Sequence, residues 1–363
     1  LKEIVMRSFN YSAGPSVLPV EVLEQVKAEL LDFGGSGMSV MEMSHRGKFY
    51  DRIHAECLSL IRELMHVPED YDILLMQGGG STQFEAVPLN LMTNHKKADY
   101  VLTGVWATKA YKEAKRYGDA AVAATSEDAN FTYIPDVKAI SFRPDIDYGY
   151  ITLNNTIYGT HYTEYPTLSA PLVGDASSNI MAEEIPVENF GLLFAGAQKN
   201  LGPAGVTVVI VKKDLLGHES EFCPTMMKYS THAAKNSLYN TPPTFAIYVM
   251  MLNLRYLKKF GGVKEMEAFN KAKSKKLYDF IDESGFYVCP NRADARSLVN
   301  IPFVTPSAEL DAKFVKEAEA QNLHSLKGHK LVGGLRASLY NGMPMEGVDA
   351  LISFMKDFEA RNK

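Results

Sequence analysis

The sequence is poor in cysteine. Its 363 residues include only three, Cys57, Cys223 and Cys289, which lie far apart in the chain. An odd number at such spacing fits neither a disulfide framework nor a zinc site, and no histidine pair stands with a carboxylate at ligand spacing. We therefore expect a reducing, cytoplasmic environment and no metal site.

Long apolar runs and an excess of basic residues are also absent. No run approaches the roughly 20 apolar residues that span a bilayer, and residues 1–7 are too few and too charged for a secretory signal. The 43 acidic and 38 basic residues give a net charge of −5 without a basic stripe. Neither a membrane nor a nucleic acid is expected as a partner.

The length and the alternating pattern of the chain are those of an α/β protein with two domains. Short apolar runs alternate with helix-length segments, which predicts parallel strands joined by helical crossovers. We expect a three-layer large domain with a mostly parallel sheet at residues 16–262. Its strands are expected at residues 72–76, 100–105, 120–124, 150–153, 172–173, 192–195 and 206–211, with helices at 20–33, 50–65 and 84–91.

The pattern changes after the glycine pair at residues 261–262. Apolar spacing predicts helices at 263–284, 310–321 and 348–358, and strands near 286–289, 298–304 and 335–339. This is typical of a smaller α+β domain, residues 263–363, which the N-terminal segment 1–15 joins. Apolar and polar residues alternate in the last strand, so Arg336 should point away from its apolar side.

Lys199 is the strongest chemical signal. An apolar run at residues 192–195 ends in small residues and then this lysine, at the sheet edge where α/β folds bind ligands. Desolvation there lowers the pKa of an amine and frees it to bond to an aldehyde cofactor. Asp175 ends the preceding apolar run, where a carboxylate can pair with the ring nitrogen of a pyridoxal cofactor. Taken alone, Lys199 could also be an ordinary solvated lysine at the end of a strand, and Asp175 a residue that caps a turn.

Two further features suit an aromatic, phosphorylated ligand. Gly80 and Ser81 lie in a glycine run between an expected strand and helix, so backbone N–H groups there can cradle an anion. The run matches neither a Walker motif nor a dinucleotide fingerprint, and a plain glycine turn is the alternative. Trp106, the single tryptophan, follows the strand at 100–105 and can stack on a cofactor ring, although core packing is the more frequent role.

Cations beside glycine occur twice, and each pair is weak evidence alone. Together they suggest a substrate that is anionic at both ends, because arginine binds carboxylate as a fork while lysine and histidine act as point donors to phosphate. The residues are His45, Arg46, His329 and Lys330, with Arg336 shortly after the second pair.

In this order, these segments resemble the phosphoserine aminotransferases, a fold-type-I pyridoxal-phosphate family of class V. The resemblance covers nearly the whole chain and rests on residues 10–15, 43–46, 78–84, 86–90, 174–178, 239–243 and 328–338. It implies pyridoxal 5′-phosphate as cofactor and a homodimer with shared active sites. The implied reaction is ping-pong transfer of the amino group from L-glutamate to 3-phosphohydroxypyruvate in serine biosynthesis. Some relatives also use 4-phosphohydroxy-L-threonine of pyridoxine biosynthesis, and the sequence leaves open whether this chain does.

The resemblance also implies a role for each motif residue. Lys199 bonds to the cofactor and moves the proton, Asp175 holds the ring nitrogen, and Trp106 stacks on the ring. The other implied cofactor contacts are Gly80, Ser81, Thr156 and Gln198, with Asn240 and Thr241 from the neighbouring subunit. Arg336 is implied at the substrate α-carboxylate, and the residues implied at the phosphate or the distal carboxylate of glutamate are His45, Arg46, His329 and Lys330.

Two departures and two alternatives accompany this reading. Ser81 stands where some relatives carry arginine, and Lys330 where many do, which predicts altered substrate affinity rather than another reaction. One alternative is a related enzyme, such as an alanine:glyoxylate aminotransferase, or a cysteine desulfurase, although no cysteine lies in a glycine-rich loop. The other is a non-catalytic protein that binds a phosphorylated ligand.

Overall fold

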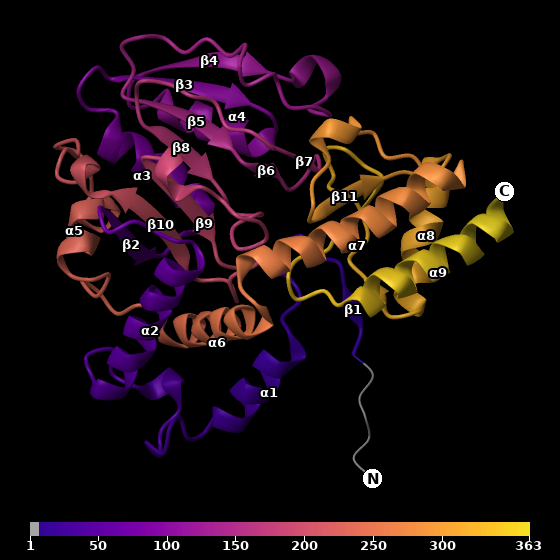
Figure 1. Ribbon diagram of the computed structural model, residues 1–363, viewed down its shortest axis with the longest axis horizontal. Helices are drawn as coiled ribbons and strands as arrows, with labels where there is room; N and C mark the ends of the chain where they lie inside the picture. The colour runs from indigo at the N-terminus through magenta and orange to yellow at the C-terminus, as the bar shows by residue number, and fades with distance from the viewer. Residues whose placement is uncertain (1–6) are drawn as a thin grey trace.

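The computed structural model describes residues 7–363, so the expectation for residues 1–7 falls almost wholly outside the described part. Seven strands form the main sheet in the order β2-β10-β9-β8-β5-β3-β4 (Figure 1). All neighbours pair in parallel except β10, which is antiparallel to β2 and β9. The strands are β2 (Tyr71–Met76), β3 (Lys97–Leu102), β4 (Asp119–Thr125), β5 (Tyr148–Thr152), β8 (Leu172–Asp175), β9 (Leu192–Gly196) and β10 (Thr207–Lys212).

Helices cover both faces of this sheet, which confirms the expected three-layer α/β architecture. Leu193 and Val208 pack with α2 (Lys48–Leu64) and α6 (Thr244–Phe260). Leu192 and Val209 pack on the other face with α3 (Gly79–Leu91) and α4 (Val105–Ala114). Successive side chains of a strand point to opposite faces, so a strand buried on both sides needs a continuous apolar run.

Two predictions about strands are wrong in detail. Because the connection from β9 to β10 contains no helix, β10 returns antiparallel instead of crossing over. β3 ends at Leu102 rather than at residue 105, since Gly104 caps α4. Trp106 therefore lies in the first turn of a helix. Helix α1 (Val20–Glu29) also ends before the expected residue 33, in a turn with left-handed glycines at 34, 35 and 37.

A second apolar core gathers the C-terminal elements, at the right of Figure 1. It joins α7 (Val263–Ser284), α8 (Ala308–Ala320) and α9 (Met345–Asn362) to β11 (Asn300–Phe303) and β13 (Leu335–Ser338). β1 (Phe9–Asn10) pairs in parallel with β12 (Leu323–His324), so the N-terminal segment contributes to this core. Instead of the strand expected at 286–289, a single bridge joins Val288 to Val304. The domain boundary at residues 262/263 stays a prediction.

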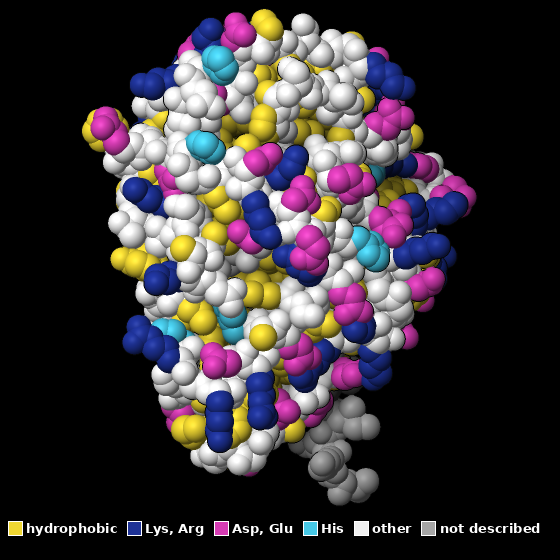
Figure 2. Space-filling view, turned by 60° about the vertical axis from the view of Figure 1, so that its left-hand side comes forward, with side chains coloured by type: hydrophobic (Ala, Val, Ile, Leu, Met, Phe, Trp, Pro, Cys, Tyr) yellow, Lys and Arg dark blue, Asp and Glu magenta, His cyan; other side chains and the backbone are white. Residues whose placement is uncertain are grey.

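The remaining elements are short. They are α5 (Tyr229–Ala234), β6 (Asn154–Asn155), β7 (Thr160–His161) and 3-10 helices at Val40–Glu42, Glu127–Ala129, Val187–Asn189, Lys213–Leu215, Thr225–Met227 and Ala293–Ala295. Within residues 7–363, no helix is both long enough and apolar enough to cross a membrane. On the face that Figure 2 shows, basic and acidic side chains are interspersed rather than separated into stripes.

Candidate active site

Lys199 lies in the turn between β9 and β10, beyond the carboxyl end of β9. Its Nζ donates a hydrogen bond to Oγ1 of Thr156 at 2.6 Å. Burial lowers the pKa of Lys199 to about 8; the Asp175 carboxylate opposes this, and the Arg336 charge adds to it. At that pKa roughly a tenth of the amine is neutral at pH 7. Lys199 is therefore a nucleophile near neutral pH.

Asp175, the last residue of β8, lines the same cavity as Lys199. Burial raises the pKa of its carboxyl, while hydrogen bonding from Ser177 and the charge of Lys199 oppose the rise. The cavity holds about 110 Å³, several times the space that one water needs. It brings together seven predicted residues: Gly80, Ser81, Trp106, Thr156, Asp175, Gln198 and Lys199.

The N-terminus of α3 forms one wall of the cavity. Gly78 caps the helix with φ 96°, and Gly79 follows with φ 67°, conformations that glycine adopts without strain. A Cβ on Gly78 would lie only 2.1 Å from Oγ1 of Thr82, so the turn requires glycine there. Gly80 and Ser81 line the cavity within the first turn. Their N–H groups have no intrahelical acceptor, and the helix dipole is positive at this end.

Buried polar atoms in the cavity wall test whether a polar ligand fits. Trp106 Nε1 and Thr152 Oγ1 are buried and have no hydrogen-bond partner among residues 7–363. An unpaired buried polar group costs about 1–3 kcal/mol, which a ligand that pairs with it would recover. An amine, a carboxylate, an indole ring and a helix N-terminus together match the aldehyde, ring nitrogen, ring face and phosphate of pyridoxal 5′-phosphate.

Arg336 approaches the cavity from β13. Its Nη1 donates to the carbonyl oxygen of Thr156 at 3.3 Å, and its charge lowers the pKa of Lys199. His329 and Lys330 lie in the loop before β13. Desolvation lowers the pKa of His329, and the charges of Arg336 and Lys330 lower it further. Of the five predicted substrate residues, Arg336 is thus joined to the cavity wall by a hydrogen bond, and His329 and Lys330 lie in the loop that precedes its strand.

None of the five predicted substrate residues lines this cavity, and neither do the predicted cofactor residues Asn240 and Thr241. His45 and Arg46 lie between the 3-10 helix Val40–Glu42 and α2, and Asn240 and Thr241 directly precede α6. Arg46 and Thr241 are exposed. The lining of the cavity that residues 7–363 form therefore includes none of His45, Arg46, Asn240 and Thr241.

Sequence reasoning missed five cavity residues: Phe84, Thr152, Asn154, Ser177 and Ser178. Asn154 donates to Oγ of Ser178 at 2.8 Å and to Oδ1 of Asn300 at 2.9 Å, which ties the loops after β5 and β8 to β11. Ser177 Oγ accepts from the N–H of Gly196 at 3.2 Å. The sequence signal that could have found Ser177 and Ser178 is their position, since both lie within three residues of Asp175.

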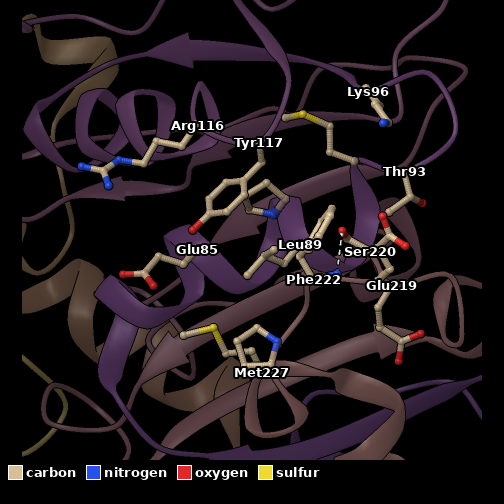
Figure 3. A pocket seen from close by; sticks show the side chains of 14 residues that line it. Glu85, Leu89, Thr93, Lys96, Arg116, Tyr117, Glu219, Ser220, Phe222 and Met227 are labelled. Carbon is tan, nitrogen blue, oxygen red and sulfur yellow. Dashed lines mark hydrogen bonds between the residues drawn. The ribbon is translucent and has the colours of Figure 1, made fainter.

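A larger cavity of about 720 Å³ lies away from Lys199, between α3, the end of α4 and the loop before α5. In Figure 3, Tyr117 lies over Leu89, and the labelled charged side chains of both signs surround them. Its lining mixes two cations with three carboxylates, and none of the predicted site residues is part of it. Because charges of both signs line this cavity, it favours neither an anionic nor a cationic ligand.

The fold is that of an aminotransferase. The family Aminotransferase class-V matches residues 8–351, and the chain belongs to it. A phosphoserine aminotransferase of Bacillus cereus is 52% identical, over 98% of this chain and 99% of its own.

Solved structures agree with this similarity. That of the phosphoserine aminotransferase from Bacillus circulans subsp. alkalophilus has a TM-score of 0.96 and 45% identity, covering 98% of this chain and 99% of the other. The phosphoserine aminotransferase from Trichomonas vaginalis, solved with bound pyridoxal phosphate, has a TM-score of 0.93 and 41% identity, covering 96% and 100%.

Proposed function

We propose that this chain is a pyridoxal-phosphate-dependent phosphoserine aminotransferase. It transfers the amino group of L-glutamate to 3-phosphohydroxypyruvate and gives O-phospho-L-serine and 2-oxoglutarate, a step of serine biosynthesis. The observation that carries the proposal is the buried amine of Lys199, held 2.6 Å from Thr156 in a cavity that Asp175 also lines. The 52% identity to a phosphoserine aminotransferase over nearly the whole chain supports the choice of substrate.

When bound, pyridoxal phosphate supplies an aldehyde that bonds to amines and a ring that withdraws electrons from the substrate α-carbon. Lys199 would hold the aldehyde carbon and, once substrate displaces it, carry the α-proton. Its pKa of about 8 suits both taking and giving that proton near neutral pH. Asp175 would bind the protonated ring nitrogen, Trp106 the ring face, and Gly80 and Ser81 the phosphate.

The substrates are anionic at both ends, and two cationic groups match them. Arg336 would bind the α-carboxylate through its planar fork. His329 and Lys330, together with His45 and Arg46, would bind the opposite end, whether phosphate or carboxylate. Histidine and lysine are point donors and need no single acceptor geometry, so one set can serve both substrates of a ping-pong reaction.

We further propose a cytoplasmic homodimer with shared active sites. Asn240 and Thr241 do not line the cavity of their own chain, and the family resemblance puts them at the cofactor phosphate of the neighbouring subunit. His45 and Arg46 also lie outside this cavity, and we propose that the dimer supplies them as well. The three cysteines are unpaired, which supports the reducing compartment.

A direct assay tests the proposal. The purified protein, loaded with pyridoxal phosphate, should form O-phospho-L-serine from glutamate and 3-phosphohydroxypyruvate, and borohydride should bleach its near-visible absorbance. Lys199→Ala should abolish turnover and this absorbance while the unfolding transition is retained. Normal turnover in that variant would refute the assignment.

Parallel arms separate the alternatives. Faster half-reaction with alanine than with glutamate would favour an alanine:glyoxylate aminotransferase. A colourless protein that binds phosphoserine without turnover would favour a binding protein. An assay of 4-phosphohydroxy-L-threonine beside phosphoserine decides whether the former is a second substrate.

A further inference from the structure

Arg336 is carried by a short sheet of two strands. β11 and β13 pair in antiparallel over only four residue pairs, and a two-stranded sheet is at best marginally stable by itself. One face of this sheet presents Ile301 and Ala337 to the second core, so the other face carries Arg336 and its register partner Pro302. A slip of one residue would turn Arg336 towards the core. The position of the guanidinium therefore depends on what holds the register.

Asn300 makes the polar pairing on the face that carries Arg336. It lies opposite Ser338 in the register, and its Nδ2 donates to Ser338 Oγ at 3.0 Å. The same Nδ2 donates to the Tyr340 hydroxyl at 3.2 Å, and that hydroxyl donates to the carbonyl oxygen of Ala13 at 2.9 Å. Asn300 and Ser338 are both buried. Any other register would leave this buried amide without partners, so Asn300 specifies the observed one.

The oxygen of the same amide joins the two-stranded sheet to the cavity wall. Asn300 Oδ1 accepts from Asn154 Nδ2 at 2.9 Å, and Asn154 lines the cavity of Lys199. Asn154 lies two residues before Thr156, whose carbonyl oxygen accepts from Arg336 Nη1. Two hydrogen bonds therefore join the same loop to the same sheet. Only the bond of Arg336 involves a group that would also bind substrate, so the bond of Asn300 holds the sheet when Arg336 turns to a ligand.

The loop that carries Thr156 also packs directly on β11. Gly159 of this loop has φ 71°, and a Cβ there would lie 2.6 Å from the carbonyl oxygen of Asn300 and closer still to the Pro302 ring. The loop and β11 are thus in contact with no space for a methyl group between them. A shift of β11 is therefore a shift of Arg336 relative to the cavity.

Arg336 has a donor that points to a ligand. The side chain is half-buried, and its Nε is buried without a hydrogen-bond partner among the described residues 7–363. A guanidinium binds a carboxylate through two parallel N–H groups in one plane. Because this geometry is narrow, a displacement of about 1 Å is enough to lose much of the binding energy.

We propose that Asn300 is a positioning residue, whose amide fixes the register of β13 and its distance from the cavity wall so that Arg336 meets the substrate α-carboxylate. The inference rests on the proposed function and deepens it, because it names what holds the carboxylate-binding group in place. It predicts that loss of this amide weakens ligands that carry the carboxylate and spares ligands that lack it.

Two phosphonates separate this role from a purely structural one. 3-Phosphonopropanoate carries a carboxylate as well as its phosphonate, whereas ethylphosphonate has the same phosphonate and no carboxylate. Neither compound has an amino group, so neither reacts with the cofactor and each measures binding alone. Calorimetry on the holoenzyme gives the two dissociation constants, and urea denaturation gives the stability of each variant.

Asn300→Leu keeps about the same volume but removes the amide. It should weaken 3-phosphonopropanoate at least about 10-fold and leave ethylphosphonate within about 2-fold. Ser338→Ala removes one acceptor only and should weaken 3-phosphonopropanoate about 3-fold, which keeps the test available if the leucine variant does not fold. Equal weakening of the two phosphonates, or an unchanged preference in both variants, would overturn the inference.

Asn90→Leu is the matched control for the loss of a buried amide. Asn90 is buried on α3, donates to the carbonyl oxygens of Ala86 and Met227 at 2.7 and 2.9 Å, and does not line the cavity. The variant should lower the urea midpoint but leave the ratio of the two dissociation constants within about 2-fold of the parent. A change in this ratio as large as that in Asn300→Leu would show that destabilisation alone explains the effect, and would overturn the inference.

A double variant tests whether Asn300 acts through Arg336. Added to Arg336→Ala, Asn300→Leu should weaken 3-phosphonopropanoate by no more than about 2-fold further, because the group that it positions is already absent. A further loss of about 10-fold would contradict the inference. A parent that binds the two phosphonates equally would overturn the role of Arg336 in the proposed function, and this inference with it. A parent that prefers 3-phosphonopropanoate, with an Asn300→Leu variant that keeps the preference, would overturn the inference alone.

Discussion

Thr156 contacts both the amine of Lys199 and the guanidinium of Arg336. Its hydroxyl accepts from Lys199 Nζ at 2.6 Å, and its carbonyl oxygen accepts from Arg336 Nη1 at 3.3 Å. Lys199 follows a strand of the main sheet, whereas Arg336 lies on β13 of the second core. One residue thus fixes the distance between the group that would hold the cofactor and the group that would hold the substrate carboxylate.

The pKa of Lys199 should set the pH dependence of cofactor uptake. The neutral amine attacks the aldehyde, and burial lowers this pKa to about 8. The rate at which the cofactor-free protein binds pyridoxal phosphate should therefore rise through pH 8 and level off above it, as followed by absorbance. Pyridoxamine phosphate, which has no aldehyde, is the control and should show no such midpoint. A midpoint near 10, that of an ordinary lysine, would contradict the prediction.

Asp175→Asn should lower kcat by at least about 100-fold, because the variant keeps the shape of the side chain but loses the charge that holds a ring proton. The Asp175 carboxylate raises the pKa of Lys199, so the uptake midpoint should also move below 8. Asp147→Asn is the control. Asp147 is a buried carboxylate that precedes β5, and it accepts from the His95 N–H at the opposite edge of the sheet. In Asp147→Asn, both kcat and the pH midpoint of cofactor uptake should stay unchanged.

Arg336→Ala should raise KM for both substrates by about 10- to 100-fold, because the α-carboxylate of each would lose a charge-assisted pair of hydrogen bonds. Lys330→Ala should instead raise KM for phosphoserine more than KM for glutamate. Steady-state kinetics with each substrate varied in turn measures both effects. Equal losses in the Lys330 variant would refute the division of labour between the two cations.

Lys273 should stabilise the turn between β13 and α9. The residue is fully buried on α7, and its Nζ donates to the carbonyl oxygens of Leu339, Tyr340 and Met343 at 2.9–3.0 Å. Lys273→Met leaves these acceptors without their donor and should lower the free energy of unfolding by about 2–4 kcal/mol at pH 10. Urea denaturation at constant pH measures the loss.

The same variant has a pH signature. Burial lowers the pKa of Lys273 from 10.5 to about 7, so between these values the unfolded state binds more protons and stability rises with pH. Lys273→Met lacks this contribution, and its deficit should therefore grow from pH 7 towards pH 10. Lys275→Met is the control on the same helix. Lys275 is exposed and pairs with Asp279, and its loss should cost no more than about 0.5 kcal/mol at any pH.

Much of the fold could be predicted because local patterns determine it. Strands buried on both faces must be apolar throughout, and α7 spans the predicted residues 263–284 because Gly262 and Gly285 flank it. The direction of β10 could not be predicted from its apolar run, which is the same for a parallel and an antiparallel strand. Only the length of the preceding connection carried that information.

The candidate site divides in the same way. Residues next to strand ends, such as Asp175 and Lys199, could be found because the carboxyl edge of the sheet gathers them. Asn154 and Asn300 meet across 146 positions of the chain, and each alone has the appearance of an ordinary loop residue.

The pairing of β1 with β12 has a consequence for biosynthesis. Phe9 is made early, but its partner Leu323 emerges only after about 310 further residues. At ribosomal rates of about 5–20 residues per second, that delay is roughly 15–60 s. During this time the nascent N-terminal segment has no sheet to join, and the second core cannot close. A ribosome-stalled chain truncated before β12 should therefore display residues 8–15 to protease, and one that extends past α9 should protect them.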